Sequence, residues 1–325
     1  MKIRYNLTAL LLLPLLALRL FAKPKKAGGQ AIIEGVMMRH RQKVSWAVRK
    51  RDGSVLVERM PFVPAAVKHR FLRWPIVRGA VSMYESLVLG YQALSRSAEI
   101  ALDDERAEKN ESKEKSKRRP IDSLVSGASF GLSILFGVGL FMYLPMKIIS
   151  LVVPSNSAIE FNAFAGAIRI AIFLTYLILI SLWKDMRRIF EYHGAEHKAI
   201  YAYEDDKELT IDTMRPYTTL HPRCGTSFLL LVAIVCILLF SVIDAAVIRF
   251  IGPYPHVGMR LIVHLLLVPL VSGSSYEVLK LSDRYRHLPL VGALIMPGLW
   301  LQKITTRRPD DSQLEVAAKA LKAVV

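Results

Sequence analysis

Residues 227–248 read SFLLLVAIVCILLFSVIDAAVI, an apolar run in which Asp244 is the only charged side chain. A run of about 20 apolar residues is long enough for a helix to cross the hydrocarbon core of a bilayer. Lipid offers no hydrogen-bond partners, so a backbone that crosses the core must be helical. This stretch therefore predicts a transmembrane helix and indicates an integral membrane protein.

Three further runs, residues 124–144, 161–183 and 261–281, are long enough to cross a bilayer in the same way. Residues 287–301 are apolar too, but two prolines and two glycines interrupt this shorter run, so we expect a re-entrant or interfacial segment. Residues 7–22 are apolar, short and flanked by Lys and Arg. A poor cleavage site favours a short anchor or interfacial helix over a cleaved signal peptide, and its length leaves open whether it spans the membrane.

The chain carries a formal net charge of +17, and its Lys and Arg residues are unevenly placed. Seven of them lie in residues 184–223, whereas Lys147 is the only one between the first two spans. Short loops rich in Lys and Arg stay on the cytoplasmic side of a membrane. We therefore expect the N-terminal region, this loop and the C-terminal tail to face the cytoplasm.

The basic charge also indicates partners. Besides the lipid bilayer, the N-terminal region is expected to bind an anionic lipid or a protein partner. No zinc-finger, RNP or helix-turn-helix pattern accompanies the charge, so nucleic acid is not an expected partner.

The region before the spans has the pattern of a small α+β domain. Residues 30–38 and 44–57 alternate in strand fashion, and Asp52-Gly53 within the second stretch is a strong hairpin signal. Residues 75–103 repeat apolar side chains at helical spacing. We expect this helix to pack on its own domain, with a membrane-surface helix as the alternative.

The predicted fold is an α-helical multi-pass membrane protein with about four transmembrane helices, a re-entrant or interfacial segment and a small cytoplasmic α+β domain. Its parts are an anchor (1–26), the basic α+β domain (27–103), a charged linker (104–120), the transmembrane domain with a cytoplasmic loop at 184–225 (121–303) and a tail (304–325). The tail is expected to hold a short helix capped by Ser312.

The cytoplasmic loop contains the motif H-x-x-E-H, formed by His193, Glu196 and His197. On a helix the two histidines lie one turn apart on one face, so both imidazoles can reach one metal ion. Glu196 could then polarise a water molecule, as in the inverted zincin motif. This pattern predicts a metal site, most simply for zinc, with Glu196 as the catalytic residue.

Three residues are candidates to complete the metal site: His221, Cys224 and Glu277. Imidazole and thiolate are good zinc ligands, and a carboxylate inside a membrane span is costly enough to indicate a function. With both His221 and Cys224 the shell would be closed and structural. With three protein ligands and an open position the site would be catalytic.

Each candidate also has a structural interpretation. The two histidines could be ordinary polar residues of an interfacial helix, with Glu196 paired to Lys198 or Arg188. Glu277 could pair with Arg223 or Arg284 near the headgroups.

Two other acidic residues, Glu34 and Asp244, lie among apolar residues in the sequence. Glu34, flanked by apolar strand residues, is either a buried partner for Arg39 or Arg78 or a further site acid. Asp244 is expected near the outer end of its span, in contact with solvent.

Five blocks of the sequence resemble, in order, the YqhQ-like family of bacterial multi-pass membrane proteins. They are GGQAIIEGVMMR (28–39), VRGAVSMYESLVLGYQAL (77–94), FEYHGAEHKAIYAYE (190–204), HPRCGTSFL (221–229) and PGLWLQKITTRRPDDSQLEVA (297–317). The family is largely uncharacterised and is described as predicted metal-dependent enzymes. The resemblance thus implies a bacterial inner-membrane location and a metal, without a substrate or mechanism.

Two classes of function follow. The first is a zinc-dependent membrane hydrolase that acts at the cytoplasmic face. The second is a non-enzymatic membrane scaffold or regulator, with a structural metal or none. The sequence leaves the substrate and the oligomeric state open.

Overall fold

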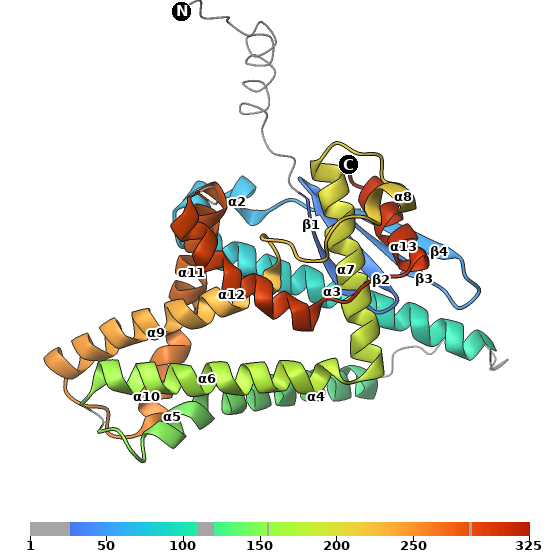
Figure 1. The fold of residues 1–325 in the computed structure, drawn as a ribbon. Coiled ribbons are helices and arrows are strands. Elements are labelled where there is room, and N and C mark those ends of the chain that lie inside the picture. Colours follow the sequence, from blue (N-terminus) through green and yellow to red (C-terminus); the bar gives the residue numbers. More distant parts are fainter. Residues whose placement is uncertain (1–26, 109–119, 155, 286–287) are drawn as a thin grey trace, which may run out of the picture.

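The computed structural model describes residues 27–108, 120–154, 156–285 and 288–325. The predicted anchor at residues 7–22 lies outside the described residues. Figure 1 shows an antiparallel sheet with helices around it on one side of the molecule, and long helices that extend away from it.

The sheet has four strands in the order β1-β2-β3-β4, all antiparallel to their neighbours. The strands are β1 (Gly28–Ile32), β2 (Gly35–His40), β3 (Lys43–Arg49) and β4 (Val55–Pro61). The predicted hairpin at Asp52-Gly53 connects β3 to β4. The first predicted strand is instead two strands, because the chain reverses at Glu34, whose φ of 52° is left-handed.

A long helix connects this sheet to the rest of the molecule. A short helix α2 (Ala65–Lys68) and a 3₁₀ turn η1 (Arg70–Arg73) lead into α3 (Val77–Glu108). One face of α3 packs Leu89 and Ala93 against the sheet, and α3 also packs along α11. The predicted packing of this helix on its own domain is therefore present, and the helix touches the membrane part as well.

Seven helical elements of the described residues make up most of the membrane part. They are α4 (Pro120–Val138), the π-helical turn η2 (Gly139–Tyr143), α5 (Leu144–Ile149), α6 (Ala158–Ser181), α9 (Gly225–Phe250), α10 (Val257–Leu266) and α11 (Val268–Arg284). Among the described residues, three segments are long and apolar enough to cross a membrane: Ala128–Ile149, Ala158–Ser181 and Phe228–Phe250.

The fourth predicted span is present only as a bent pair. Helices α10 and α11 meet at an angle of 52°, and the pair raises the number of possible spans to four. Pro269 in the first turn of α11 explains the break, since proline cannot donate the hydrogen bond that would continue α10. The run predicted to be re-entrant forms a helix, α12 (Pro289–Thr305), with Pro297 inside it.

Three separate parts of the chain build what we term the head, which consists of the sheet, α7 (Lys184–Glu204), α8 (Ile211–Met214) and α13 (Asp311–Lys322). Their apolar side chains form one core, in which Met38, Tyr192 and Leu314 are fully or almost fully buried. Helix α13 begins at Asp311, and the preceding Asp310 caps it together with Gln313. The prediction that Ser312 caps this helix is wrong, because the Ser312 hydroxyl donates to the carboxylate of Asp310 instead.

The expectation that Asp244 contacts solvent is also wrong, since its side chain is fully buried between α6, α9 and α10. Four groups reach its carboxylate: Asn162 at 2.7 Å, Tyr254 at 2.8 Å, His264 at 3.1 Å and Arg260 at 3.2 Å. The apolar sequence around Asp244 gave no sign of these partners, which come from three other segments.

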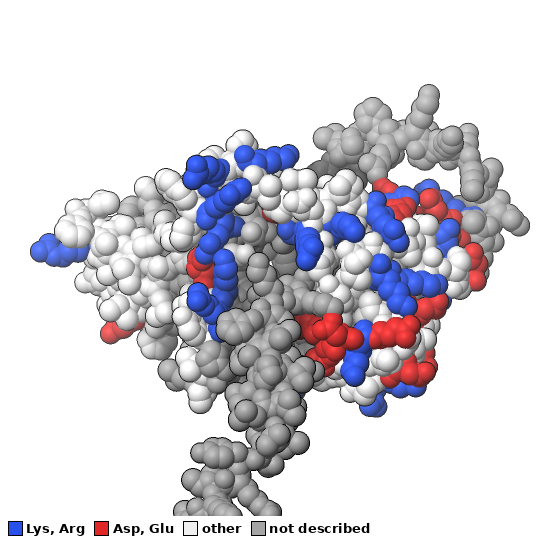
Figure 2. All heavy atoms as spheres, turned by 90° about the horizontal axis from the view of Figure 1, so that it is seen from above, with Lys and Arg blue, Asp and Glu red and all other residues white. Residues whose placement is uncertain are grey.

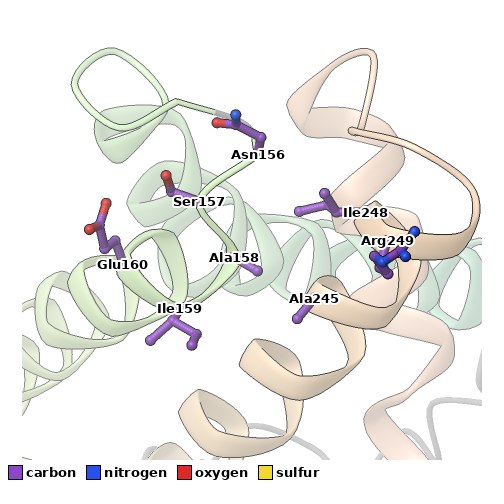
Figure 3. Close-up of a pocket in the computed structure, with 8 residues that line it drawn as sticks. All are labelled: Asn156, Ser157, Ala158, Ile159, Glu160, Ala245, Ile248 and Arg249. Carbon is purple, nitrogen blue, oxygen red and sulfur yellow. The ribbon is translucent and has the colours of Figure 1, made fainter.

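An open hollow of about 570 Å³ lies between the start of α6 and the end of α9 (Figure 3). Glu160 from α6 and Arg249 from α9 line opposite sides of it. This hollow lies at the C-terminal end of α9, whereas Cys224 precedes the N-terminal end of the same helix.

Candidate metal centre

Helix α7 carries His193 and His197 one turn apart, as the motif predicts. Their ring centroids are 4.4 Å apart. Cys224, the residue that precedes α9, lies against both rings, with its Sγ 3.1 Å from His193 Nε2. One ligand atom from each of the three residues lies within 4.8 Å of the other two. The structure therefore brings together three of the predicted ligands.

Backbone carbonyls fix the orientation of both imidazoles. His193 Nδ1 is 2.8 Å from the carbonyl oxygen of Thr305, and His197 Nδ1 bonds the carbonyl oxygen of Thr219. A carbonyl oxygen only accepts, so each Nδ1 must carry a proton, and in the neutral ring Nε2 then keeps its lone pair. Metal-binding histidines in proteins show this arrangement, in which the second ring nitrogen donates to a carbonyl or carboxylate.

His197 Nε2 is buried and has no hydrogen-bond partner among the described residues. Burial lowers the pKa of His197, which favours the neutral ring. A buried lone pair without a donor is costly in a folded protein unless a ligand satisfies it. The position of this atom is therefore consistent with a metal ligand.

The thiol of Cys224 is buried, and its neighbours favour its ionised form. Burial raises the pKa of this thiol, but His197 and the hydroxyl and amide of Thr226 lower it by more. The pKa of Cys224 therefore lies below its ordinary value. The Thr226 hydroxyl oxygen is 2.8 Å from Sγ. The thiolate is the form of cysteine that binds metals.

Glu196 lies next to the three-residue group without belonging to it. Its carboxylate accepts a hydrogen bond from the Gly29 amide in β1, and burial raises its pKa to about 8. The second carboxylate oxygen has no partner among the residues the structure describes. A Cβ at Gly29 would lie 2.9 Å from the Glu196 side chain, so only glycine admits the carboxylate here.

His221 is buried beside the group, with its ring 5.5 Å from that of His197. Its Nε2 lies 3.8 Å from a carboxylate oxygen of Glu204, and its Nδ1 accepts from the Arg223 amide at 3.3 Å. Both ring nitrogens are thus oriented to groups other than the cluster. The structure does not bring His221 into the three-residue group.

Two other candidates pair with arginines that the sequence did not indicate. Glu277 binds Arg78 with both carboxylate oxygens, the Nε contact being 2.6 Å, rather than Arg223 or Arg284. Glu34 binds Arg188, 2.6 Å from one guanidinium nitrogen.

The alternative partners proposed for Glu34 and Glu196 are accordingly wrong. Glu34 does not pair with Arg39 or Arg78. Arg188 is bound to Glu34, and Lys198 donates to the backbone carbonyls of Arg215 and Tyr217, so neither is the partner of Glu196.

Several residues that shape the site were not found from the sequence. Gly194 stands between the two histidines, and a Cβ there would collide with the carbonyl oxygen of Arg307. The glycine lets the chain after α12 run along α7, where the Arg307 amide donates to Phe190 at 2.8 Å. This places the Thr305 carbonyl on His193. The glycine inside the motif was the only sequence signal of this contact.

The chain resembles proteins whose activity has no description. A family model described as "Protein of unknown function (DUF1385)" matches residues 74–325. The chain is 33% identical over 300 residues to "Uncharacterized protein YqhQ" of Bacillus subtilis (strain 168). The matched residues make up 91% of each of the two chains. No solved structure matches. These descriptions give neither a metal nor a reaction.

Proposed function

The chain belongs to the DUF1385 family, and we propose that it binds one zinc ion, or another divalent transition metal, through His193, His197 and Cys224. The observation that carries the proposal is the convergence of the two imidazoles on Cys224 while both Nδ1 atoms are held by backbone carbonyls. Two imidazoles and one thiolate form a donor set that suits zinc.

We further propose that the centre is catalytic and that the protein is a zinc-dependent membrane hydrolase. Three protein ligands leave the fourth position of a tetrahedral ion open, as in catalytic zinc sites. In such a site zinc supplies a Lewis acid for an attacking water or a substrate carbonyl. Glu196 would serve as the general base, because the positive charge of a bound ion would lower its raised pKa and ionise the carboxylate.

The localisation is part of the proposal. The head would face the cytoplasm of a bacterial cell, with the spanning helices in the inner membrane, because the head carries the Lys-rich and Arg-rich segments. The centre would then lie at the membrane surface, since Cys224 directly precedes α9, whose apolar segment begins at Phe228.

A scaffold or regulator with a structural metal is the second candidate. Burial favours it, because Cys224 is only 7% exposed and Glu196 only 5% exposed. His221 could close the shell if its ring left Glu204 and turned toward the ion. The two candidates therefore differ in whether the fourth position is open.

Cobalt substitution distinguishes the candidates. We expect the Co(II)-loaded, detergent-purified full chain to show sulfur-to-cobalt charge transfer that Cys224→Ala abolishes. Addition of acetohydroxamate should change the visible spectrum, because this chelator needs an open position. His221→Ala should bind cobalt as the wild type does, and Glu196→Gln should keep the metal, since neither residue belongs to the three-residue group.

The opposite pattern would support the scaffold. A spectrum that does not respond to acetohydroxamate, together with loss of cobalt in His221→Ala, would show a closed four-ligand site.

A further inference from the structure

The segment that leads into α3 exposes large apolar and basic side chains together. Trp74 is 67% exposed and Phe71 is 57% exposed, although both are aromatic. Their neighbours Lys68, Arg70 and Arg73 are exposed as well. We term residues 63–76, which contain α2 and η1, the α2–η1 surface. Aromatic and basic residues side by side are typical of protein surfaces at the membrane interface.

Basic side chains predominate around this surface, although the Glu85 carboxylate accepts a hydrogen bond from the Ala65 amide of α2. Residues 59–84 contain no Asp or Glu, while they include four arginines and a lysine. Figure 2, which views the molecule from above, shows a row of Lys and Arg over the region of α2 and α11. Such a field attracts anionic groups, and it favours phosphate over a neutral or basic partner.

The packing of two glycines fixes the α2–η1 surface to the membrane part. A Cβ at Gly79 would lie 2.7 Å from the Gly273 carbonyl oxygen, and a Cβ at Gly273 would collide with Ile76. Ile76 itself has a φ of 68°, which β-branched residues rarely adopt, so the turn before α3 is held by this close contact. The Arg78–Glu277 pair binds the same two helices.

This packing sets the depth of the surface relative to the spans. Helix α11 is the second half of the bent apolar pair, whose apolar segment ends at Ser282. Figure 1 shows α2 beside the end of α11, on the side of the molecule that carries the sheet. The contacts of Ile76 with Gly273 and of Arg78 with Glu277 therefore place the α2–η1 surface beside the second half of the bent pair, toward the end at Ser282.

The exposed apolar face continues along α3. Tyr84, Leu87 and Tyr91 are each more than half exposed, and their helix positions allow them to share a face. The opposite face of α3 holds the side chains that pack on the sheet. A helix with one face on its own domain and an exposed apolar face beside a span fits contact with lipid.

We propose that the α2–η1 surface binds the phosphate groups of anionic phospholipids in the leaflet next to the head, with Phe71 and Trp74 inserted among the headgroups. Lys68 and Arg70 provide the charge. Arg73 is partly committed to the fold, because its guanidinium donates to the carbonyl oxygens of Ala66 and Val67. This inference is independent of the metal centre.

Hydrogen–deuterium exchange of the full chain in nanodiscs tests the proposal. We expect residues 63–76 to exchange more slowly in an equal mixture of phosphatidylglycerol and phosphatidylcholine than in phosphatidylcholine alone. Each of Lys68 and Arg70 should contribute about fivefold to this difference. Lys68→Gln/Arg70→Gln should remove most of it. The control Lys207→Gln/Lys322→Gln, which removes two exposed charges from the head, should leave it unchanged.

A salt titration of the wild type provides a second readout that needs no variant. The protection in the anionic nanodiscs should fall as the ionic strength rises, because exposed charges are screened. Equal exchange in the two lipid mixtures, or protection that salt and Lys68→Gln/Arg70→Gln leave intact, would overturn the proposal. Fast exchange in both mixtures would likewise overturn lipid binding and would favour a protein partner for this surface.

Discussion

Replacement of His197 by alanine is expected to reduce the zinc affinity of the full chain by more than about 100-fold. Loss of a residue that only orients a ligand typically costs about 10–100-fold in metal affinity, and loss of the ligand itself should cost more. His197 is the stronger test of the two histidines, since its Nε2 is buried without a partner among the described residues. Competition with a chromophoric chelator measures the affinity directly.

Matched variants separate the loss of a ligand from the loss of the fold. Cys224→Ser changes one atom and little volume, so it should keep the fold and still weaken zinc binding strongly. His69→Ala removes an exposed histidine outside the cluster and should bind zinc like the wild type. Unchanged zinc affinity in both His197→Ala and Cys224→Ser would refute the assignment of these ligands.

Replacement of Asp244 by alanine is expected to lower the free energy of unfolding by about 3–5 kcal/mol, the cost of breaking a buried ion pair from one side. The variant leaves Arg260 and His264 buried without their shared carboxylate. It also removes the acceptor of Asn162 and Tyr254. Four partners from three segments would thus lose their shared carboxylate in a low-dielectric interior.

Unfolding of the purified chain in mixed micelles, followed by circular dichroism, provides the measurement. Asp244→Asn keeps a polar side chain at the centre and should destabilise less. Asp212→Ala removes an exposed carboxylate paired with Arg215, so its effect should stay within about 1 kcal/mol. If Asp244→Ala and Asp212→Ala unfold alike, the buried cluster does not hold the membrane helices together.

Much of the membrane part follows from local sequence. Three apolar runs predicted helices that the structure contains. The prediction was possible because a single apolar segment that crosses lipid must form its backbone hydrogen bonds within a helix. The fourth run was predicted without its break, although Pro269 marks the point at which α11 begins. The head was harder to predict, since its core joins β2, α7 and α13, which are far apart in the chain.

The same division applies to the candidate site. The spacing of His193 and His197 is a local signal, and helix geometry converts it into adjacent rings. The orientation of those rings depends on the carbonyls of Thr219 and Thr305, and a backbone carbonyl has no residue-type signature. The partner of Glu277 could not be found either, because Arg78 lies 199 residues away in sequence.

X-ray absorption at the zinc edge of the purified, full-length protein tests the central claim most directly. The account predicts one zinc ion per chain, with one sulfur at about 2.3 Å and at least two nitrogens at about 2.0–2.1 Å. A protein that purifies without metal and gains none on addition of zinc, or a zinc shell that contains no sulfur, would contradict it.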